Sequence, residues 1–320
     1  MTQQIVVGLG PVTPDIVQPV LGADVRFVEQ PTAEDLQHAV GAIVRAAYVL
    51  DAAALAAMPS LKVAARTGVG YDLVDVAAAD KNGVAVAITP GSNSQAVAEG
   101  VMAHVLHLVK RLAPLHKLVA TGKFADRTKY PVGDLEGATI GILGFGRIGS
   151  RVAHLASAFG MKVIAFDPFV EVPVQYRAAT IEEVLANGDI VSLHMPLTAE
   201  NKYLINATTL KTMKIGAILI NCSRGALIDL DAALVALNSG KLGGLGLDVF
   251  DPEPPAPHAI FDHENVLLTP HVMGLSVKAT QATFIDAARA VRAVIDGQEP
   301  DALVNSIAFS QLQQIQKKSE

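Results

Sequence analysis

The sequence predicts a two-domain α/β protein in which each domain contains a parallel sheet flanked by helices. Three observations support this fold class. Short apolar runs alternate with helix-like segments along most of the chain. A glycine-rich turn joins an apolar run to a helix-like segment within Thr139–Asp167. The length of 320 residues is sufficient for about two domains.

Five apolar runs before residue 90 have the length of strands. Thr32 and Asp51 are typical first residues of helices, and Asp51 precedes a helix expected over Ala52–Ala57. A further helix is expected over Asp72–Asp80. This alternation predicts a compact parallel unit with a flavodoxin-like arrangement. Its strands are expected at Ile5–Val7, Val25–Val28, Ala42–Arg45, Leu61–Ala65 and Val84–Ala87.

The middle of the chain predicts two helices and a connection. An apolar helix is expected over Val97–Leu112, and a second one over Leu115–Thr121. Between Gly122 and Leu135 the chain is polar and irregular, which indicates a surface arm or a connection. The glycine-rich segment begins directly after it.

The segment Thr139–Asp167 has the order strand, glycine turn, helix, strand and acid. Gly144 ends the first run and permits a tight turn. Gly146 leaves room for a pyrophosphate near the backbone, and Gly149 lets the helix pack closely on the strand. This order predicts a doubly wound sheet of the Rossmann type with a dinucleotide site, and the alternative is a glycine-rich turn that binds nothing.

The helix of this segment is expected over Arg147–Phe159, and the second strand over Val163–Phe166. Free N–H groups at a helix start bind phosphate, so the backbone at Arg147 and Ile148 is expected to cradle the pyrophosphate. Asp167 is placed to accept hydrogen bonds from a ribose 2′-hydroxyl, and its charge repels a 2′-phosphate. The expected cofactor is therefore NAD.

Helices and strands continue to alternate after the glycine-rich segment. Helices are expected at Ile181–Ala186, Asp231–Asn238 and Ser276–Ile295, and strands at Ile190–Leu193, Ala217–Asn221, Leu245–Val249 and Val266–Leu268. The tail is expected to return to the first domain. We therefore expect a smaller, discontinuous substrate-binding domain formed by residues 1–97 and 291–320, and a dinucleotide-binding domain formed by residues 98–290.

The bulk composition excludes several classes of function. The net charge of −6 provides no basic surface for nucleic acid. No apolar run reaches membrane-spanning length, and the first residues lack the pattern of a signal peptide. The single cysteine, Cys222, excludes an internal disulfide framework and fits a reducing compartment. We therefore expect a soluble cytoplasmic protein that acts on neither nucleic acid nor membrane.

Seven segments carry a more specific signal, and they are RTGVGYDLVD, VAEGVMAHVLHLVKR, LGFGRIG, SLHMPLT, NCSRGALID, GLDVFDPEPP and TPHVMG. In this order and spacing they resemble the D-isomer-specific 2-hydroxyacid dehydrogenases over nearly the full length of the chain. The phosphoglycerate dehydrogenases and the glyoxylate or hydroxypyruvate reductases are the types most similar. The resemblance implies NAD-dependent interconversion of a D-2-hydroxy acid and its 2-keto acid. It also implies a homodimer with Val97–Thr121 in the contact.

The resemblance assigns catalytic roles to three residues. Arg224 in NCSRG is expected to grip the substrate carboxylate and polarise the C2 oxygen, because its planar fork suits a bidentate contact. His271 is expected to exchange the proton, and Glu253 to pair with it and fix its tautomer. Without the motifs, Arg224 would be a solvated or salt-bridged residue, His271 a surface or core histidine, and Glu253 a solvated acid in a proline-rich loop. A metal site at His271 and Glu253 is disfavoured, because no third ligand is suggested.

Four further residues are expected near the cofactor. Asp248 is expected to approach the nicotinamide carboxamide, and the alternative is a structural cap of a helix or loop. His194 and Pro196 in SLHMPLT are expected to line the cofactor cleft, with His194 as a packing residue. Cys222 is expected to line the cleft and not to act as a nucleophile, because no base is adjacent in the sequence.

On the substrate side, the backbone N–H groups of Val69 and Gly70 resemble the family's cradle for the substrate carboxylate. Arg45 and Arg66 resemble arginines that hold a second anionic group in phosphoglycerate dehydrogenases. The alternative is surface pairing of these arginines with acids such as Asp72.

These features favour 3-phosphoglycerate as the hydroxy acid, with glyoxylate, hydroxypyruvate or another 2-keto acid as alternatives. A non-enzymatic alternative is a binding protein that senses NAD, like the corepressors on the same scaffold. Asn201, Met273 and Leu275 depart from the family's usual residues and put the nicotinamide-side contacts and the substrate size in question. The residues after about 305 are too few for a regulatory domain, so regulation through one is not expected.

Overall fold

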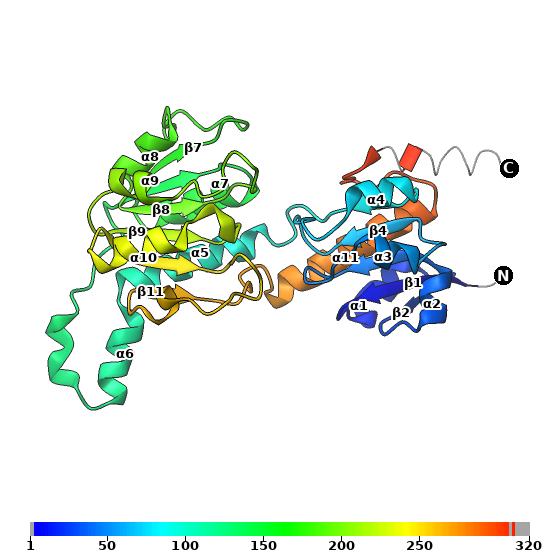
Figure 1. The fold of residues 1–320 in the computed structure, drawn as a ribbon, viewed down its shortest axis with the longest axis horizontal. Helices are drawn as coiled ribbons and strands as arrows, with labels where there is room; N and C mark the ends of the chain where they lie inside the picture. The colour runs from blue at the N-terminus through cyan, green and yellow to red at the C-terminus, as the bar shows by residue number, and fades with distance from the viewer. Residues whose placement is uncertain (1–2, 307–308, 311–320) are drawn as a thin grey trace. The chain divides into compact units, whose positions relative to one another are not determined.

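The structure is a computed structural model and describes residues 3–306 and 309–310. It divides into two compact units (Figure 1). Unit 1 comprises Met1–Asn93 and Ser276–Glu320, and unit 2 comprises Ser94–Leu275. Each unit contains one parallel sheet with helices on both faces, so the predicted fold class is confirmed.

Unit 1 contains a five-stranded sheet with the order β2-β1-β3-β4-β5, which is the flavodoxin-like order. Helices α1 and α11 pack on one face, and α3 and α4 on the other. The strands are β1 (Gln4–Leu9), β2 (Val25–Val28), β3 (Ala39–Val44), β4 (Val63–Arg66) and β5 (Ala85–Ala87). The helices are α1 (Pro14–Leu21), α2 (Ala33–His38), α3 (Ala52–Ala56), α4 (Val76–Lys81) and α11 (Val277–Ile295).

Unit 2 contains a six-stranded sheet with the order β11-β10-β9-β8-β6-β7. The strand order reverses between β6 and β8, which is where a doubly wound sheet opens a crevice for ligands. The strands are β6 (Thr139–Leu143), β7 (Lys162–Phe166), β8 (Ile190–Leu193), β9 (Ala217–Asn221), β10 (Leu242–Leu247) and β11 (Val266–Leu268). The helices are α5 (Ser94–Val109), α6 (Leu112–Ala120), α7 (Arg147–Ala158), α8 (Ile181–Asn187), α9 (Ala207–Thr212) and α10 (Leu230–Asn238), with short 3₁₀ helices at Phe124–Lys129, Gly225–Leu227 and Ala259–Asp262.

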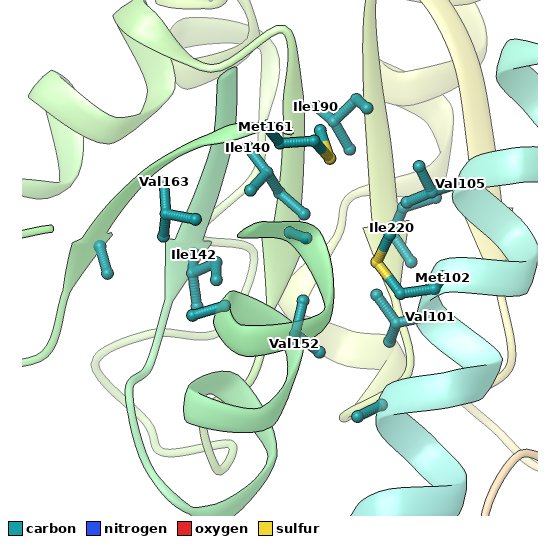
Figure 2. Packing of buried hydrophobic residues seen from close by; sticks show 14 of the residues in the cluster. Val101, Met102, Val105, Ile140, Ile142, Val152, Met161, Val163, Ile190 and Ile220 are labelled. Carbon is teal, nitrogen blue, oxygen red and sulfur yellow. The ribbon is translucent and has the colours of Figure 1, made fainter. Parts of the chain in front are cut away.

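The core of unit 2 follows from the alternation of side chains along its strands. On one face, Ile140 and Ile142 of β6 and Ile220 of β9 pack against α5 and α7. Figure 2 shows Val101, Met102 and Val105 of α5 directed at Ile220. On the other face, Leu219 and the neighbouring strands pack against α8, α9 and α10. Both faces are therefore apolar, and the polar chemistry is confined to the strand ends.

The domain boundaries differ from those expected from the sequence. Helix α11 belongs to unit 1 as a whole, because it packs on β3 and β4 and on α1. Gly41 makes this close packing possible, since a Cβ there would lie 2.6 Å from Val291 of α11. Helix α5 belongs to unit 2 as a whole. The expected cuts at residues 97/98 and 290/291 therefore move to 93/94 and 275/276. That unit 1 binds the substrate remains a prediction.

Several helix limits also differ from expectation. Helix α4 begins at Val76, not at Asp72, because the Asp75 side chain accepts from the Ala78 N–H and caps the helix there. The expected helices over residues 97–112 and 115–121 are displaced, because Arg111 has a left-handed φ of 52° and separates α5 from α6. Helices α1 and α9 were not expected. The caps at Thr32 and Asp51 are confirmed.

Candidate active site

Three neighbouring strands of unit 2 bring the expected catalytic residues to one edge of the sheet. Arg224 follows β9, Glu253 follows β10, and His271 follows β11. These strands are adjacent and parallel, so their carboxyl ends lie side by side. In open α/β sheets this edge is where ligands bind.

The loop after β9 holds Arg224 through buried polar contacts. The side chain of Asn221 donates to the Arg224 carbonyl at 2.8 Å and accepts from the Ser223 N–H at 3.0 Å. Gly225 brings this loop against the backbone of Phe250, where any Cβ would overlap with the carbonyl group. Arg224 is half-buried, and its guanidinium donates to the Ser223 carbonyl at 2.7 Å. The loop that carries Arg224 therefore packs directly on the loop that carries Glu253.

Glu253 connects that loop to His271. Its Oε1 accepts from the Phe250 N–H at 2.9 Å, and its Oε2 lies 2.7 Å from His271 Nδ1. A carboxylate only accepts, so Nδ1 carries the hydrogen and Nε2 is left for proton exchange. Side-chain exposure is 49% for His271 and 37% for Glu253, so both can meet a ligand.

His271 has a left-handed backbone with a φ of 53°. For a residue with a Cβ this conformation costs about 1–2 kcal/mol. Such strain persists where surrounding contacts hold it and is concentrated at functional sites. The conformation of His271 therefore lowers the stability of the fold. This observation supports a functional role for His271 and does not depend on the sequence motif.

Asp248 is buried and caps the loop that carries His271. Its Oδ1 accepts from the Thr269 hydroxyl at 2.6 Å and the Val272 N–H at 2.9 Å, and its Oδ2 accepts from the Met273 N–H at 3.1 Å. Of the two interpretations from the sequence, the structure shows the cap. The carboxylate has lone pairs left that could accept from a nicotinamide carboxamide, and this contact remains a prediction.

The glycine turn fits the pyrophosphate of a dinucleotide. Gly144 has a φ of 96°, and a Cβ there would overlap with the His194 carbonyl after β8. A Cβ at Gly149 would overlap with the Gly144 carbonyl, so the helix packs as closely as the motif requires. A Cβ at Gly146 would meet nothing within 4 Å. Gly146 caps α7 without any side-chain bond, so the first N–H groups of α7, at Arg147 and Ile148, remain for phosphate.

Asp167 lies at the end of β7, beside a pocket lined by residues 166–172 and 177–179. Its Oδ2 accepts from the Phe145 N–H at 2.7 Å. Its Oδ1 accepts from Phe169 at 2.8 Å and Val170 at 3.0 Å. A carboxylate offers about four lone-pair directions, so one remains for a ribose hydroxyl. The residue thus also ties the glycine turn to the loop after β7.

Replacing Asp167 by alanine is expected to weaken NADH binding and to reduce discrimination against NADPH by about tenfold or more. The substitution removes the negative charge that opposes a 2′-phosphate and the acceptor for the ribose. Fluorescence titration with both reduced cofactors measures the ratio of the two Kd values. Asp167→Asn, which keeps one acceptor oxygen, should lose discrimination and retain more NADH affinity. An unchanged Kd ratio in both variants would contradict the assignment.

His194, Pro196 and Cys222 lie at the strand ends around the glycine turn. The Ser192 hydroxyl lies 2.8 Å from His194 Nε2, and His194 Nδ1 is buried without a partner among the described residues. Burial lowers the pKa of His194 to about 4, which suits a neutral packing residue. Burial also raises the pKa of the Cys222 thiol far above its ordinary value, which disfavours a nucleophilic role. Pro196 is exposed, and its carbonyl accepts from Asn201 at 2.8 Å.

The free energy of unfolding is expected to fall as the pH drops from 6.5 to about 4. Burial lowers the pKa of His194 across this range, so the unfolded chain binds a proton that the folded chain refuses. Acidification therefore destabilises the fold, by up to about 3 kcal/mol from this residue. Burial lowers the pKa of His104 as well, which adds to the slope. Asp35 and Asp189 have lowered carboxyl pKa values and titrate below this range.

Urea denaturation at about pH 7 and about pH 5 measures this slope. His194→Gln retains a polar group for Ser192 and should flatten the slope in part. His154→Gln, at an exposed position on α7, is the matched control and should leave the slope unchanged. An equal slope in wild type and His194→Gln would assign the effect to other groups.

In unit 1, Val69 and Gly70 lie in the turn after β4. Val69 is exposed, and Gly70 is half-exposed. Among the described residues, no acceptor contacts their N–H groups. Gly68, with a φ of 139°, donates to the Thr89 hydroxyl at 2.7 Å and shapes the turn. Two successive N–H groups without acceptors can bind a carboxylate.

The guanidinium of Arg66 is not exposed to a substrate anion, in contrast to the expectation from the sequence. It is 4% exposed, and its guanidinium lies among backbone carbonyl groups. The recorded acceptors are the carbonyl oxygens of Gly70 at 3.1 Å, Arg45 at 2.7 Å, Tyr48 at 3.3 Å and Ala46 at 3.0 Å. Arg66 therefore ties the turn at residues 69–70 to the loop after β3. A direct contact of Arg66 with a second anionic group of the substrate is not supported by this geometry.

Arg45 is different, because its guanidinium lies 5.2 Å above the ring of Phe284 in α11. Among the described residues, no carboxylate lies within ion-pair distance of it. Partial burial lowers its pKa, although its ordinary value is so high that the charge persists. Arg45 is therefore a cation without a carboxylate partner among the described residues of unit 1.

The sequence analysis missed several polar residues that hold the site together. Asn221 ends β9, Thr269 directly follows β11, and Ser192 lies one residue before the end of β8. A polar residue that ends an apolar run is a detectable signal, since buried polar groups need partners. His104 carried no such signal, because it lies in the interior of the apolar helix α5.

Two negative findings concern residues 3–306 and 309–310. No helix in this part of the chain combines the length and the apolar character that a membrane crossing requires. No three histidine, cysteine or carboxylate side chains gather there as ligands of a metal ion.

A family model and several known proteins are similar to this chain in sequence. A family model described as D-isomer specific 2-hydroxyacid dehydrogenase, NAD binding domain, matches residues 102–273. D-3-phosphoglycerate dehydrogenase of Bacillus subtilis is 40% identical over 275 residues, which are 83% of this chain and 52% of that protein. Glyoxylate reductase of Thermofilum pendens is 38% identical over 266 residues, which are 80% of this chain and 78% of that protein. The chain thus spans about half the length of the phosphoglycerate dehydrogenase it matches.

Among solved structures, a D-lactate dehydrogenase of Aquifex aeolicus in complex with NAD and lactic acid matches with a TM-score of 0.80 and 30% identity. The match covers 94% of this chain and 98% of that one. Its fold extends through both units, whereas the family model covers only part of unit 2. Together with the relatives in sequence, these matches show that the chain belongs to the D-isomer-specific 2-hydroxyacid dehydrogenase family and contains its NAD-binding domain.

Proposed function

We propose that this chain is an NAD-dependent oxidoreductase that interconverts a D-2-hydroxy acid and its 2-keto acid. The observation that carries the proposal is the pairing of His271 with Glu253 next to the Arg224 loop, at the ends of adjacent strands. This combination supplies a proton donor and an anion-binding group beside a nucleotide-binding turn. The left-handed backbone of His271 is a second observation that supports the proposal.

NADH, held by the glycine turn at Gly144–Gly149 and by Asp167, would supply the hydride that reduces C2 of the keto acid. His271 donates its Nε2 proton to the C2 oxygen, while Glu253 at Nδ1 stabilises the positively charged ring. Arg224 binds the carboxylate and polarises the C2 carbonyl through its fork of N–H groups. The N–H groups of Val69 and Gly70, in unit 1, are proposed to bind a carboxylate. In oxidation, His271 takes up the hydroxyl proton.

For the substrate, we propose D-3-phosphoglycerate, with glyoxylate, hydroxypyruvate and other 2-keto acids as alternatives. Arg45 supports this choice, because a phosphate would supply the counter-charge that it lacks among the described residues. Relatives with both kinds of name match at similar identity, so the names do not decide between the substrates.

A panel of keto acids with NADH tests the function. Phosphohydroxypyruvate, hydroxypyruvate, glyoxylate and pyruvate are compared by the rate of NADH oxidation. The proposal expects turnover, with the highest kcat/KM for phosphohydroxypyruvate. If NADH binds but no keto acid accelerates its oxidation, a cofactor-sensing binding protein is the better interpretation.

Replacing Arg45 by glutamine is expected to raise the KM for phosphohydroxypyruvate by about tenfold, because one charge-assisted contact to the phosphate is lost. The KM for glyoxylate should change by less than about twofold, since glyoxylate has no second anionic group. Arg45→Lys, which keeps the charge, should lie between the two. Equal effects on both substrates would indicate that Arg45 supports the fold and does not select the substrate.

We further propose that the chain forms a homodimer with Val97–Thr121 in the contact. Leu112 and Val119 of α6 are 51% and 65% exposed, and Phe124 in the following segment is 61% exposed. Apolar side chains gathered on one short stretch are typical of an interface. Analytical ultracentrifugation should give twice the mass of the chain, and Val119→Asp should shift the population toward the monomer. A monomeric wild type at micromolar concentration would exclude this dimer.

A further inference from the structure

Helix α5 contacts the loop that carries His271 through a buried histidine. His104 is 1% exposed, and its Nε2 lies 3.1 Å from the Thr269 hydroxyl. That hydroxyl lies 2.6 Å from Asp248 Oδ1. A chain of three side chains thus runs from the interior of α5 to the carboxylate that caps residues 269–273.

The direction of the hydrogens in this chain follows from its acceptor end. Asp248 only accepts, so the Thr269 hydroxyl donates its hydrogen to the carboxylate. The hydroxyl oxygen then accepts from His104, so His104 carries its hydrogen on Nε2. Its Nδ1 is a bare acceptor, buried and without a partner among the described residues. Gly246 of β10 leaves the room for it, since a Cβ there would lie 2.7 Å from Nδ1.

A second contact of α5 lies one turn away. Gly100 leaves a notch in the helix surface, and a Cβ there would overlap with the side chain of Met273. Residues four apart share one face of a helix, so Gly100 and His104 face the same loop. They contact it on either side of His271, at Met273 and at Thr269. The departure from the family pattern at Met273 thus has a packing reason in this chain.

We propose that His104 is a positioning residue that acts through Thr269 and Asp248 to hold His271 in its left-handed conformation. The inference rests on the proposed function, in which His271 exchanges the proton. The hydrogen bonds of Asp248 to Val272 and Met273 fix the loop immediately after His271. The His271 N–H donates to the Thr269 carbonyl at 3.0 Å, which fixes the loop before it. His104 donates to the Thr269 hydroxyl and so orients that hydroxyl toward Asp248, which adds one more hydrogen bond that holds the loop.

Steady-state kinetics with five variants test the proposal. His104→Leu and Thr269→Val should each lower kcat about tenfold, because a small displacement of a catalytic group has a large effect on rate. The KM for NADH should change by less than about twofold, because the glycine turn is untouched. His104→Gln places a donor near the position of Nε2, and Thr269→Ser keeps the hydroxyl, so both should retain most of the wild-type kcat. The double variant His104→Leu/Thr269→Val should be no slower than Thr269→Val alone, because both changes break one chain.

Thr283→Val in α11 is the matched control. Thr283 is 5% exposed and its hydroxyl donates to the Ala279 carbonyl at 2.6 Å, so its loss removes a buried hydroxyl in unit 1, whereas the loop belongs to unit 2. It should lower the denaturation midpoint without changing kcat. If His104→Leu behaves like this control, His104 serves only the fold. Additive losses in the double variant would show that His104 does not act through Thr269.

Amide hydrogen exchange tests the positioning role of His104 independently of whether the protein turns over a keto acid. The amides of Val272 and Met273, which donate to Asp248, should exchange at least about tenfold faster in His104→Leu and Thr269→Val than in wild type. His104→Gln and Thr283→Val should not show this increase. The readout needs no substrate, so it stands even if no keto acid is turned over. Unchanged protection of both amides in Thr269→Val would overturn the positioning role.

Discussion

Replacing His271 by asparagine is expected to lower kcat roughly a thousandfold, because the reaction then lacks its proton donor and acceptor. General acid–base groups contribute about 10²–10⁴ in rate. Asparagine is the sharpest choice at this position, because it tolerates a φ of 53° and its amide can still donate to Glu253. The loop and the carboxylate partner are thereby preserved, and only proton exchange is lost. His271→Ala should be as slow, with an added loss of stability.

The measurement is kcat for keto-acid reduction together with the Kd for NADH by fluorescence. The Kd should stay within about threefold of wild type, because the glycine turn does not involve residue 271. Glu253→Gln offers a graded comparison, since Gln keeps an acceptor for the Phe250 N–H and loses the charge beside His271. It should cost about 10- to 100-fold in kcat. A kcat for His271→Asn within about tenfold of wild type would exclude His271 as the proton donor.

Replacing Arg224 by lysine is expected to lower kcat/KM for the keto acid by about 10²–10³. Lysine keeps the positive charge but loses the planar fork that binds a carboxylate and a carbonyl oxygen together. The loss should appear in both kcat and KM, because the polarisation of the carbonyl is lost as well as binding. Arg224→Ala should be slower still.

The control is Arg26→Lys, at a surface position of β2 where the arginine pairs with Asp35. It should leave kcat/KM unchanged, because exposed ion pairs contribute little and lie outside the site. NADH affinity should be retained in the Arg224 variants. If they lose NADH binding as well, Arg224 supports the cofactor domain and is not the anion clamp.

The strands were more predictable than the helices, for a physical reason. The bounds of β2, β8, β9 and β11 agree with the expectation, because each is a short, mostly apolar run of strand length. Helix α1 (PDIVQPVL) was missed because Pro19 lies inside it and proline disfavours helix interiors, although Val17 and Leu21 recur at helical spacing. Helix α9 was missed because its sequence, ATTLKT, contains a single large apolar residue. Both helices are stabilised by packing, which a local pattern does not contain.

The identity of the candidate site residues was predictable, and their individual roles were only partly so. Motifs selected Arg224, Glu253 and His271, and the parallel sheet brings their strands together. The role of Arg66 was not predictable, because three of its carbonyl acceptors belong to the loop after β3, about 20 residues earlier in the chain. The cap formed by Asp248 depends on residues more than 20 positions later. Contacts of this range are set by the tertiary fold and leave no local pattern.

The close packing at Gly225 has a consequence for which mutations are expected to change the substrate. Since no side chain fits between that residue and Phe250, the parts of the chain that bear the guanidinium and the carboxylate form a single rigid piece. The three proposed catalytic side chains belong to unit 2, whereas Arg45 and the turn at residues 69–70 belong to unit 1. Under the proposed function, mutations in unit 1 are expected to alter which acid is accepted and to leave the redox step intact.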